Sequence, residues 1–91
     1  MKIKPIHKIR IEAIIAAIWK NENENGGARF NVQLSRIYKD DEGKWKSTES
    51  FGPHDLLVVA KVADQAHSWI NQQEQEEINR ILADTKKLLS T

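Results

Sequence analysis

The stretch that most constrains the fold lies at residues 9–19, where every odd position is apolar. These positions hold Ile9, Ile11, Ala13, Ile15, Ala17 and Trp19. A period of two is typical of a β-strand, and isoleucine favours extended backbone because its branched side chain is restricted in a helix. A helix is the competing interpretation because alanine is frequent here, but no wholly polar helical face exists. We therefore predict extended backbone over 9–19, as one strand or as two if the chain bends at its middle.

Two further strands are predicted on the C-terminal side. Residues 30–35 alternate strictly, and residues 44–51 form a strand with Trp45 and Phe51 in phase. The alternation shifts at residues 36–38, as it would at a bulge or where the strand changes its cover. Turn clusters at residues 21–27 and 40–43 contain glycines that can adopt the positive φ of a hairpin. Together these segments predict an antiparallel meander of three or four strands.

A helix is predicted over residues 53–72. Pro53 suits the first helical position and Asp55 the first turn, where the helix dipole favours a negative charge. Apolar side chains then recur at spacings of three and four, with Trp69 at the edge of the stripe. The predicted stripe consists of Leu56, Val59, Ala60, Ala63, Ala66, His67 and Ile70.

Polar residues fill positions 71–77 without any proline or glycine, and a second apolar stripe follows. That stripe consists of Ile78, Ile81, Leu82, Leu88 and Leu89. It predicts a helical tail over residues 74–90, either continuous with the main helix or separate from it. The predicted fold is α+β: one domain over residues 1–91, with a curved antiparallel sheet packed against a C-terminal helix and its tail.

One helix covers one face of a sheet, so the other face needs its own cover. The even positions Ile14, Ala16 and Ile18 would lie on that second face. Burying a large aliphatic side chain contributes about 1.5–3 kcal/mol, which favours covering them. The tail or a second copy of the chain would provide the cover, and we expect a homodimer.

Composition excludes several classes of protein. The 91 residues contain no cysteine, so disulfides and thiol chemistry are absent, and the mean hydropathy is −0.60. No apolar stretch reaches the roughly 18 residues of a membrane helix, so no membrane partner is expected. The polar start of the sequence is unlike a signal peptide, which predicts a cytoplasmic location.

The sequence also offers little for catalysis. His7, His54 and His67 lack metal-ligand spacing, and no glycine-rich phosphate loop is present. We interpret His67 as a packed core residue, His54–Asp55 as part of a helix cap, and residues 40–43 as a hairpin turn. We therefore expect no enzyme, no catalytic residue, no metal, no cofactor and no small-molecule substrate.

Charge is distributed unevenly along the chain. Residues 1–47 carry ten Lys/Arg and six Asp/Glu, whereas residues 48–91 carry four and seven. Five of the six acids in the first part fall in the two predicted turns, so the strands are basic. Cations neutralise phosphates, and aromatic rings stack on unpaired bases. The candidate nucleic-acid-binding residues are Arg10, Lys20, Arg29, Arg36, Tyr38, Lys44, Trp45 and Lys46.

Several short motifs occur in an order that resembles a known group of proteins. They are Ile18-Trp19, Arg36-Ile37-Tyr38, Gly43-Lys44-Trp45 and Ala66-His67-Ser68-Trp69-Ile70. Over residues 9–70 the chain resembles a family of small bacterial proteins similar to the single-stranded-DNA-binding regulator fold of whirly proteins and transcriptional coactivators. The resemblance implies a curved sheet followed by a helix, pairing as a dimer, and a role in transcription regulation. The chain departs from the coactivators at Ser47, where they carry proline, and lacks the lysine-glycine-lysine element of whirly proteins.

Two functions follow as expectations. The first is a small dimeric protein that binds single-stranded DNA or RNA through its basic sheet. The alternative is a protein-interaction or assembly module without a nucleic-acid role, suggested by the stripe at residues 78–89, whose spacing suits helix–helix contact.

Overall fold

A tight turn divides the first apolar stretch into two strands. The computed structural model describes residues 4–24 and 26–89, so residues 1–3, Asn25 of the predicted turn and residue 90 of the predicted tail lie outside the description. Strands β1 (His7–Ile11) and β2 (Ile14–Glu22) pair antiparallel across the two-residue turn Glu12–Ala13. Glu12 adopts a φ of 54°, and its carbonyl accepts a 2.7 Å hydrogen bond from Arg10 Nε. The prediction of extended backbone is confirmed for residues 9–11 and 14–19, and of the two alternatives the chain forms two strands, because residues 12–13 are a turn.

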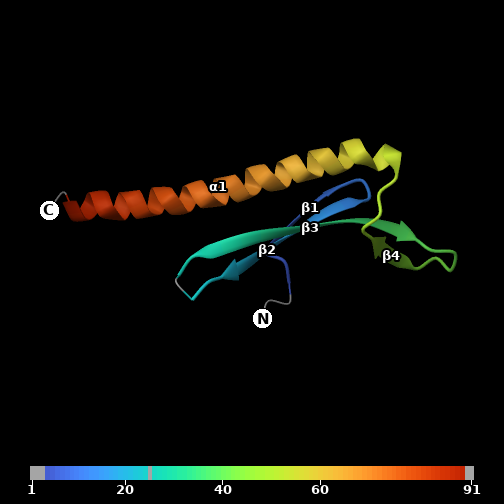
Figure 1. Ribbon diagram of the computed structural model, residues 1–91, viewed down its shortest axis with the longest axis horizontal. Helices are drawn as coiled ribbons and strands as arrows, with labels where there is room; N and C mark the ends of the chain where they lie inside the picture. The colour runs from blue at the N-terminus through green and yellow to red at the C-terminus, as the bar shows by residue number, and fades with distance from the viewer. Residues whose placement is uncertain (1–3, 25, 90–91) are drawn as a thin grey trace.

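The sheet is a four-stranded antiparallel meander with the order β1-β2-β3-β4, as Figure 1 shows. Strands β3 (Ala28–Lys39) and β4 (Trp45–Thr48) complete it. The turns before and after β3 contain Gly26 and Gly43, with φ of 83° and 80°. The register of β3 is continuous, so the shift in its sequence pattern marks a change of neighbour from β2 to β4 and no bulge.

The third predicted strand is shorter than expected. β4 ends at Thr48, and Phe51 lies in the connection to the helix, where it packs against the core. Trp45 is 65% exposed. The prediction that Trp45 and Phe51 share one strand face is therefore wrong, because the strand ends between them.

The turn at Glu12–Ala13 also changes which residues share a face. Cross-strand partners point to the same side of a sheet, and Ile9 pairs with Ala16 while Ile11 pairs with Ile14. Odd positions of β1 therefore lie on the same side as even positions of β2. The predicted continuous odd face is therefore wrong for β2. Across a two-residue turn, each odd residue of β1 pairs with an even residue of β2.

The helix begins with a short 3-10 turn. Segment η1 (Pro53–Asp55) leads into α1 (Leu56–Leu89), a single α-helix of 34 residues. The Gly52 N–H donates a 2.8 Å hydrogen bond to Asp55 Oδ2, which confirms the predicted capping role of Asp55. The tail is thus a continuation of the main helix, since no residue between 71 and 77 interrupts the backbone.

The core lies where the first half of α1 crosses β2. Ile14, Ala16 and Ile18 of β2 are fully buried, together with Val62 and Ala66 of α1. The small side chains of Ala16 and Ala66 leave room for the isoleucines of this cluster. The even positions of β2, predicted to need a cover other than the helix, are therefore the ones that α1 covers.

The buried stripe of α1 is rotated relative to the predicted one. Val62 is buried, whereas Leu56, Ala60 and His67 are exposed, so the interpretation of His67 as a core residue is wrong. Alanine and leucine on both sides of the helix left its sheet-facing side ambiguous in the sequence. Trp69 is half-buried, and its ring stacks on the His7 ring with centroids 4.5 Å apart.

The second half of α1 extends beyond the sheet (Figure 1), which gives the molecule its length of 67 Å. Every residue from 74 to 89 is exposed. Within the described residues, no helix combines the length and the apolar character needed to cross a membrane.

We expect Ile18→Ala to lower the free energy of unfolding by about 2–5 kcal/mol, because it removes buried methyl groups and leaves a cavity. Chemical denaturation measures this loss. Leu57→Ala is the control, since Leu57 is 78% exposed on the same domain. Equal losses for the two variants would contradict the assignment of the core.

Candidate nucleic-acid interface

One face of the sheet lies away from α1, and we call it the open face. It consists of the even positions of β1 and the odd positions of β2, β3 and β4, as the strand registers require. The even positions of β2 and β3 hold Ile14, Ala16, Ile18, Phe30 and Leu34, which pack in the core with α1. The side chains of the odd positions therefore point to the opposite side.

The open face is basic. It carries Lys8, Arg10, Arg29 and Lys39, and none of its strand positions, all of them within the described residues, holds Asp or Glu. Asn31, Gln33 and Ser35 of β3 supply uncharged hydrogen-bonding groups between the cations. Positive charge without neighbouring carboxylates on the same surface attracts anions.

Two tryptophans lie on the open face. The Trp45 ring is 65% exposed, and Lys39 Nζ lies 5.6 Å from its centroid. Trp19 is half-buried, and its Nε1–H donates a 3.1 Å hydrogen bond to Gln33 Oε1. Their partners on β3 are Asn31 and Lys39, which places the two rings about 27 Å apart along the strand. The surface thus has one ring at each end.

The predicted nucleic-acid-binding residues divide between the two faces. Arg10, Arg29 and Trp45 lie on the open face. Lys20, Arg36, Tyr38 and Lys46 lie on the side that carries α1, and Lys44 lies in the turn before β4. The strands therefore bring three of the eight together.

The cations on the helix side have partners within the protein. Lys20 Nζ lies 5.8 Å from the centroid of Phe30. Arg36 Nε lies 3.3 Å from Asp55 Oδ2, and the Arg36 guanidinium lies 5.8 Å from the centroid of Tyr38. These contacts link the sheet to its own aromatic rings and to the helix cap.

Three residues of the open face are not among the predicted nucleic-acid-binding residues. Trp19 belongs to the apolar odd positions of the predicted strand, Lys8 lies before the alternating stretch, and Lys39 adjoins the acidic turn. Their odd or even position within each strand identifies them, once the turn at Glu12–Ala13 shows which positions face away from α1.

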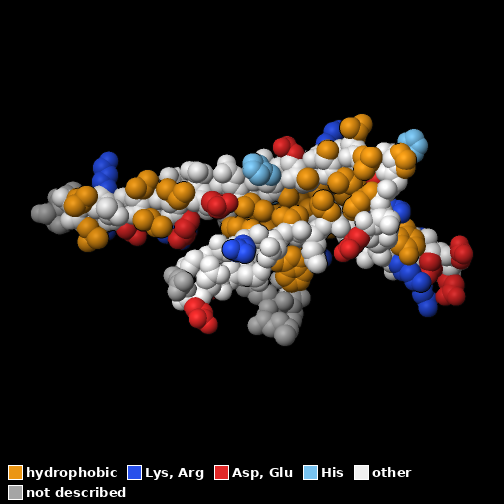
Figure 2. Space-filling model, viewed as in Figure 1, with side chains coloured by type: hydrophobic (Ala, Val, Ile, Leu, Met, Phe, Trp, Pro, Cys, Tyr) orange, Lys and Arg blue, Asp and Glu red, His pale blue; other side chains and the backbone are white. Residues whose placement is uncertain are grey.

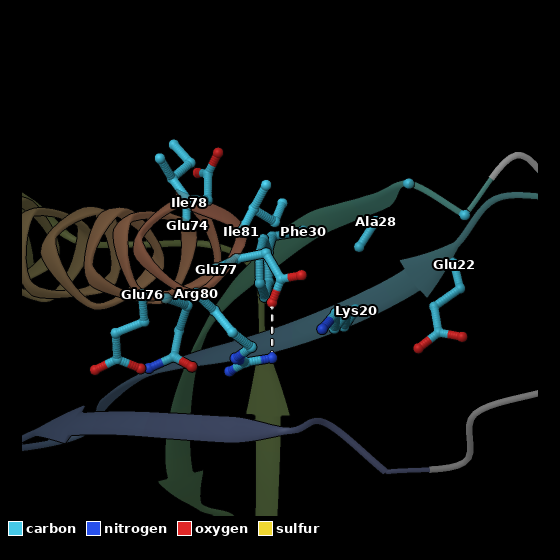
Figure 3. Close-up of a pocket in the computed structure, with 13 residues that line it drawn as sticks. Lys20, Glu22, Ala28, Phe30, Glu74, Glu76, Glu77, Ile78, Arg80 and Ile81 are labelled. Carbon is cyan, nitrogen blue, oxygen red and sulfur yellow. Dashed lines mark hydrogen bonds and ion pairs between the residues drawn. The ribbon is translucent and has the colours of Figure 1, made fainter. Parts of the chain in front are cut away.

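A groove of about 640 Å³ lies between α1 and the end of the β2–β3 hairpin (Figure 3). Its charged lining consists of Lys20, Glu22, Glu74, Glu76, Glu77 and Arg80. Arg80 Nη1 forms a 3.0 Å ion pair with Glu77 Oε2, drawn as a dashed line in Figure 3. With four acids against two cations, the groove is less suited to a polyanion than the open face.

Asp40 fixes the turn that presents Lys39 and Trp45. Its Oδ1 accepts hydrogen bonds from the N–H groups of Lys44 at 2.8 Å and Glu42 at 2.9 Å, and its Oδ2 lies 3.2 Å from Lys46 Nζ. The Lys44 N–H is the main reason that the pKa of Asp40 is lowered, and the Lys46 side chain and the Glu42 N–H add to it, whereas desolvation opposes them. The carboxylate therefore holds the hairpin end in one conformation.

We expect the Asp40 carboxyl to titrate below its ordinary pKa of 3.8. Because its pKa is lowered in the folded state, it contributes stability above the unfolded pKa, and this contribution is lost as the pH falls through the folded pKa. Carbon chemical shifts of the carboxyl group measure the titration. Lys46→Met should raise the pKa only partly, since the Lys44 N–H bond remains, and an unshifted Asp40 would contradict the described turn.

Comparison with known proteins yields no relative. No protein-family model matches the chain, and no curated protein or solved structure is significantly similar to it. The resemblance to the whirly and coactivator fold stays a prediction, and the candidate site rests on the geometry of the chain itself.

Proposed function

We propose that this protein binds single-stranded nucleic acid on the open face of its sheet. The observation that carries the proposal is the coincidence of four cations and two tryptophans on a face without strand-borne carboxylates. The other face is covered by α1, and its strands carry Glu22.

Each component of the open face has a role in this proposal. Lys8, Arg10, Arg29 and Lys39 neutralise phosphates and release counterions. The exposed Trp45 ring provides a surface for stacking, and Lys39 beside it places a positive charge next to the stacked base. Stacking requires unpaired bases, which favours a single strand over a duplex.

We expect the affinity for an oligo-dT strand to fall steeply with salt. Four phosphate contacts predict a slope of about −3 in a plot of log K against log salt concentration, at about 0.7 per contact on a single strand. Arg29→Ala should reduce the slope by about 0.7. Fluorescence anisotropy of a labelled strand, titrated at several salt concentrations, measures both values.

Lys20→Ala is the matched control for Arg29→Ala. Lys20 lies near the same end of the sheet, but on the side of α1 and beside Phe30. Its loss should leave the slope unchanged. Equal effects of the two variants would show that binding depends on net charge and not on the open face. The absence of binding at micromolar protein concentration would contradict the proposal.

Trp45→Ala should weaken binding by about 1–3 kcal/mol if a base stacks on this ring. Tyr38→Ala is the control, because Tyr38 is an exposed aromatic residue on the opposite face of the sheet. The same titrations measure both variants. A larger effect of Tyr38→Ala would place the strand on the side of α1.

A second function, association with another protein chain, is supported by the exposed end of α1. Ile78, Ile81, Leu82, Leu88 and Leu89 are between 47% and 82% exposed. Figure 2 shows apolar side chains at this end of the helix, separate from those between helix and sheet. Apolar stripes at helical spacing suit contact with a second helix.

A further inference from the structure

One hydrogen bond on the open face fixes the orientation of a side-chain amide. Trp19 of β2 donates its Nε1–H to Gln33 Oε1 of β3 at 3.1 Å. An indole N–H is a donor only, so the atom of Gln33 that faces Trp19 has to be the carbonyl oxygen. The NH2 group of Gln33, with its two donors, therefore points away from Trp19. Gln33 is exposed, so a ligand on the open face can reach these donors.

The strand registers place this amide beside a small residue. Gln33 pairs with Ala17, and Ala17 pairs with Lys8 on its other side. The three residues form one row on the open face, and the backbones of Lys8 and Gln33 lie about 10 Å apart across it. Ala17 carries only a methyl group and remains partly accessible, so a flat base can lie over it. Such a base has one edge beside the Gln33 amide, and Lys8 on the other side is placed for an adjoining phosphate.

The fixed amide distinguishes between bases. Glutamine recognises adenine by presenting its oxygen and its NH2 group together to N6 and N7. Because its oxygen is turned toward Trp19, Gln33 does not offer this pair to a base. Its free donors suit a ring carbonyl oxygen, such as O2 or O4 of thymine. Thymine, uracil, cytosine and guanine carry such an oxygen, whereas adenine has none and places its N6 donor beside N1 and N7.

We infer that Gln33, held by Trp19, makes the open face select bases with a carbonyl oxygen against adenine. Gln33 is then a specificity-determining residue, and Trp19 is a positioning residue that acts through it. The inference rests on the proposed binding of a single strand and adds the class of strand, one poor in adenine. One net hydrogen bond corresponds to a preference of about two- to tenfold.

The ratio of the affinities for oligo-dT and oligo-dA of equal length tests the inference. In the unchanged protein, the oligo-dT strand should bind more tightly. Adenines also stack on one another in a free strand, which affects the ratio without any selection by the protein. The ratio is therefore compared between variants, because the stacking within the strand is the same for all of them. Fluorescence anisotropy at one fixed salt concentration measures both affinities.

Two substitutions should change the ratio in different ways. Gln33→Ala removes the donors, so the affinity for oligo-dT should fall about two- to tenfold while that for oligo-dA stays the same. Trp19→Phe keeps an aromatic ring but removes the indole N–H. The Gln33 amide can then present its oxygen and NH2 group together, so the affinity for oligo-dA should rise while that for oligo-dT stays the same. A purely structural role of Trp19 would instead weaken the binding of both strands equally, which would overturn the inference.

Asn31→Ala is the matched control. Asn31 is an exposed amide on the same strand and face, and within the described residues no hydrogen bond fixes its side chain. Because this amide can turn to suit either base, its loss should change both affinities in proportion. Far-UV circular dichroism verifies the fold of each variant. Gln33→Ala replaces an exposed side chain, so it tests the inference even where Trp19→Phe disturbs the sheet.

The outcomes separate this inference from the proposed function. Binding with the same ratio in the unchanged protein and in Gln33→Ala overturns the inference and leaves binding on the open face intact. A tighter grip on oligo-dA that persists in Trp19→Phe and Gln33→Ala also overturns it. If neither strand binds to the unchanged protein, the proposed function is contradicted, and the inference is contradicted with it.

Discussion

The packing of α1 on β2 depends on the two-residue turn at Glu12–Ala13. This turn folds an apolar run back on itself, so that odd positions of β1 and even positions of β2 meet on one side. One helix then buries both sets with Val62 and Ala66. With the turn, Ile9, Ile11, Ile14 and Ile18 meet on the helix side, whereas Ile15 stays on the open face beside Arg10. Glu12 adopts a left-handed backbone to make this possible, which is uncommon for a residue other than glycine.

The same turn determines the composition of the open face. Ile14, Ala16 and Ile18 of β2 face the helix, whereas the other side keeps both strand tryptophans and the cations Lys8, Arg10, Arg29 and Lys39. Basic residues on the helix side contact internal partners, as Arg36 does with Asp55. The Asp40 turn holds β4 against β3, which keeps Trp45 and Lys39 adjacent. The proposed binding surface is therefore a consequence of how the core is buried.

Helix α1 has two apolar stripes that differ in direction and in surroundings. The first packs on the sheet, whereas the second lies on the protruding tail and is exposed within the described residues. Because the two stripes are offset around the axis, the helix can contact its own sheet with one half and a second chain with the other. The two proposed functions, nucleic-acid binding and association with another protein chain, would thus use separate surfaces of one small domain.

The sequence by itself determined the strands, the glycine turns, the helix start at Pro53–Asp55 and the apolar character of the tail, because each depends on local backbone preferences and spacing. It also identified three residues of the open face, Arg10, Arg29 and Trp45. Only the tertiary structure decided which faces are covered and which side of α1 is buried. The reason is that an alternating pattern defines two faces of a strand but does not show which face is buried. A two-residue turn also places odd positions of one strand on the same side as even positions of the next. Contact between segments distant in the sequence therefore decides which face is buried.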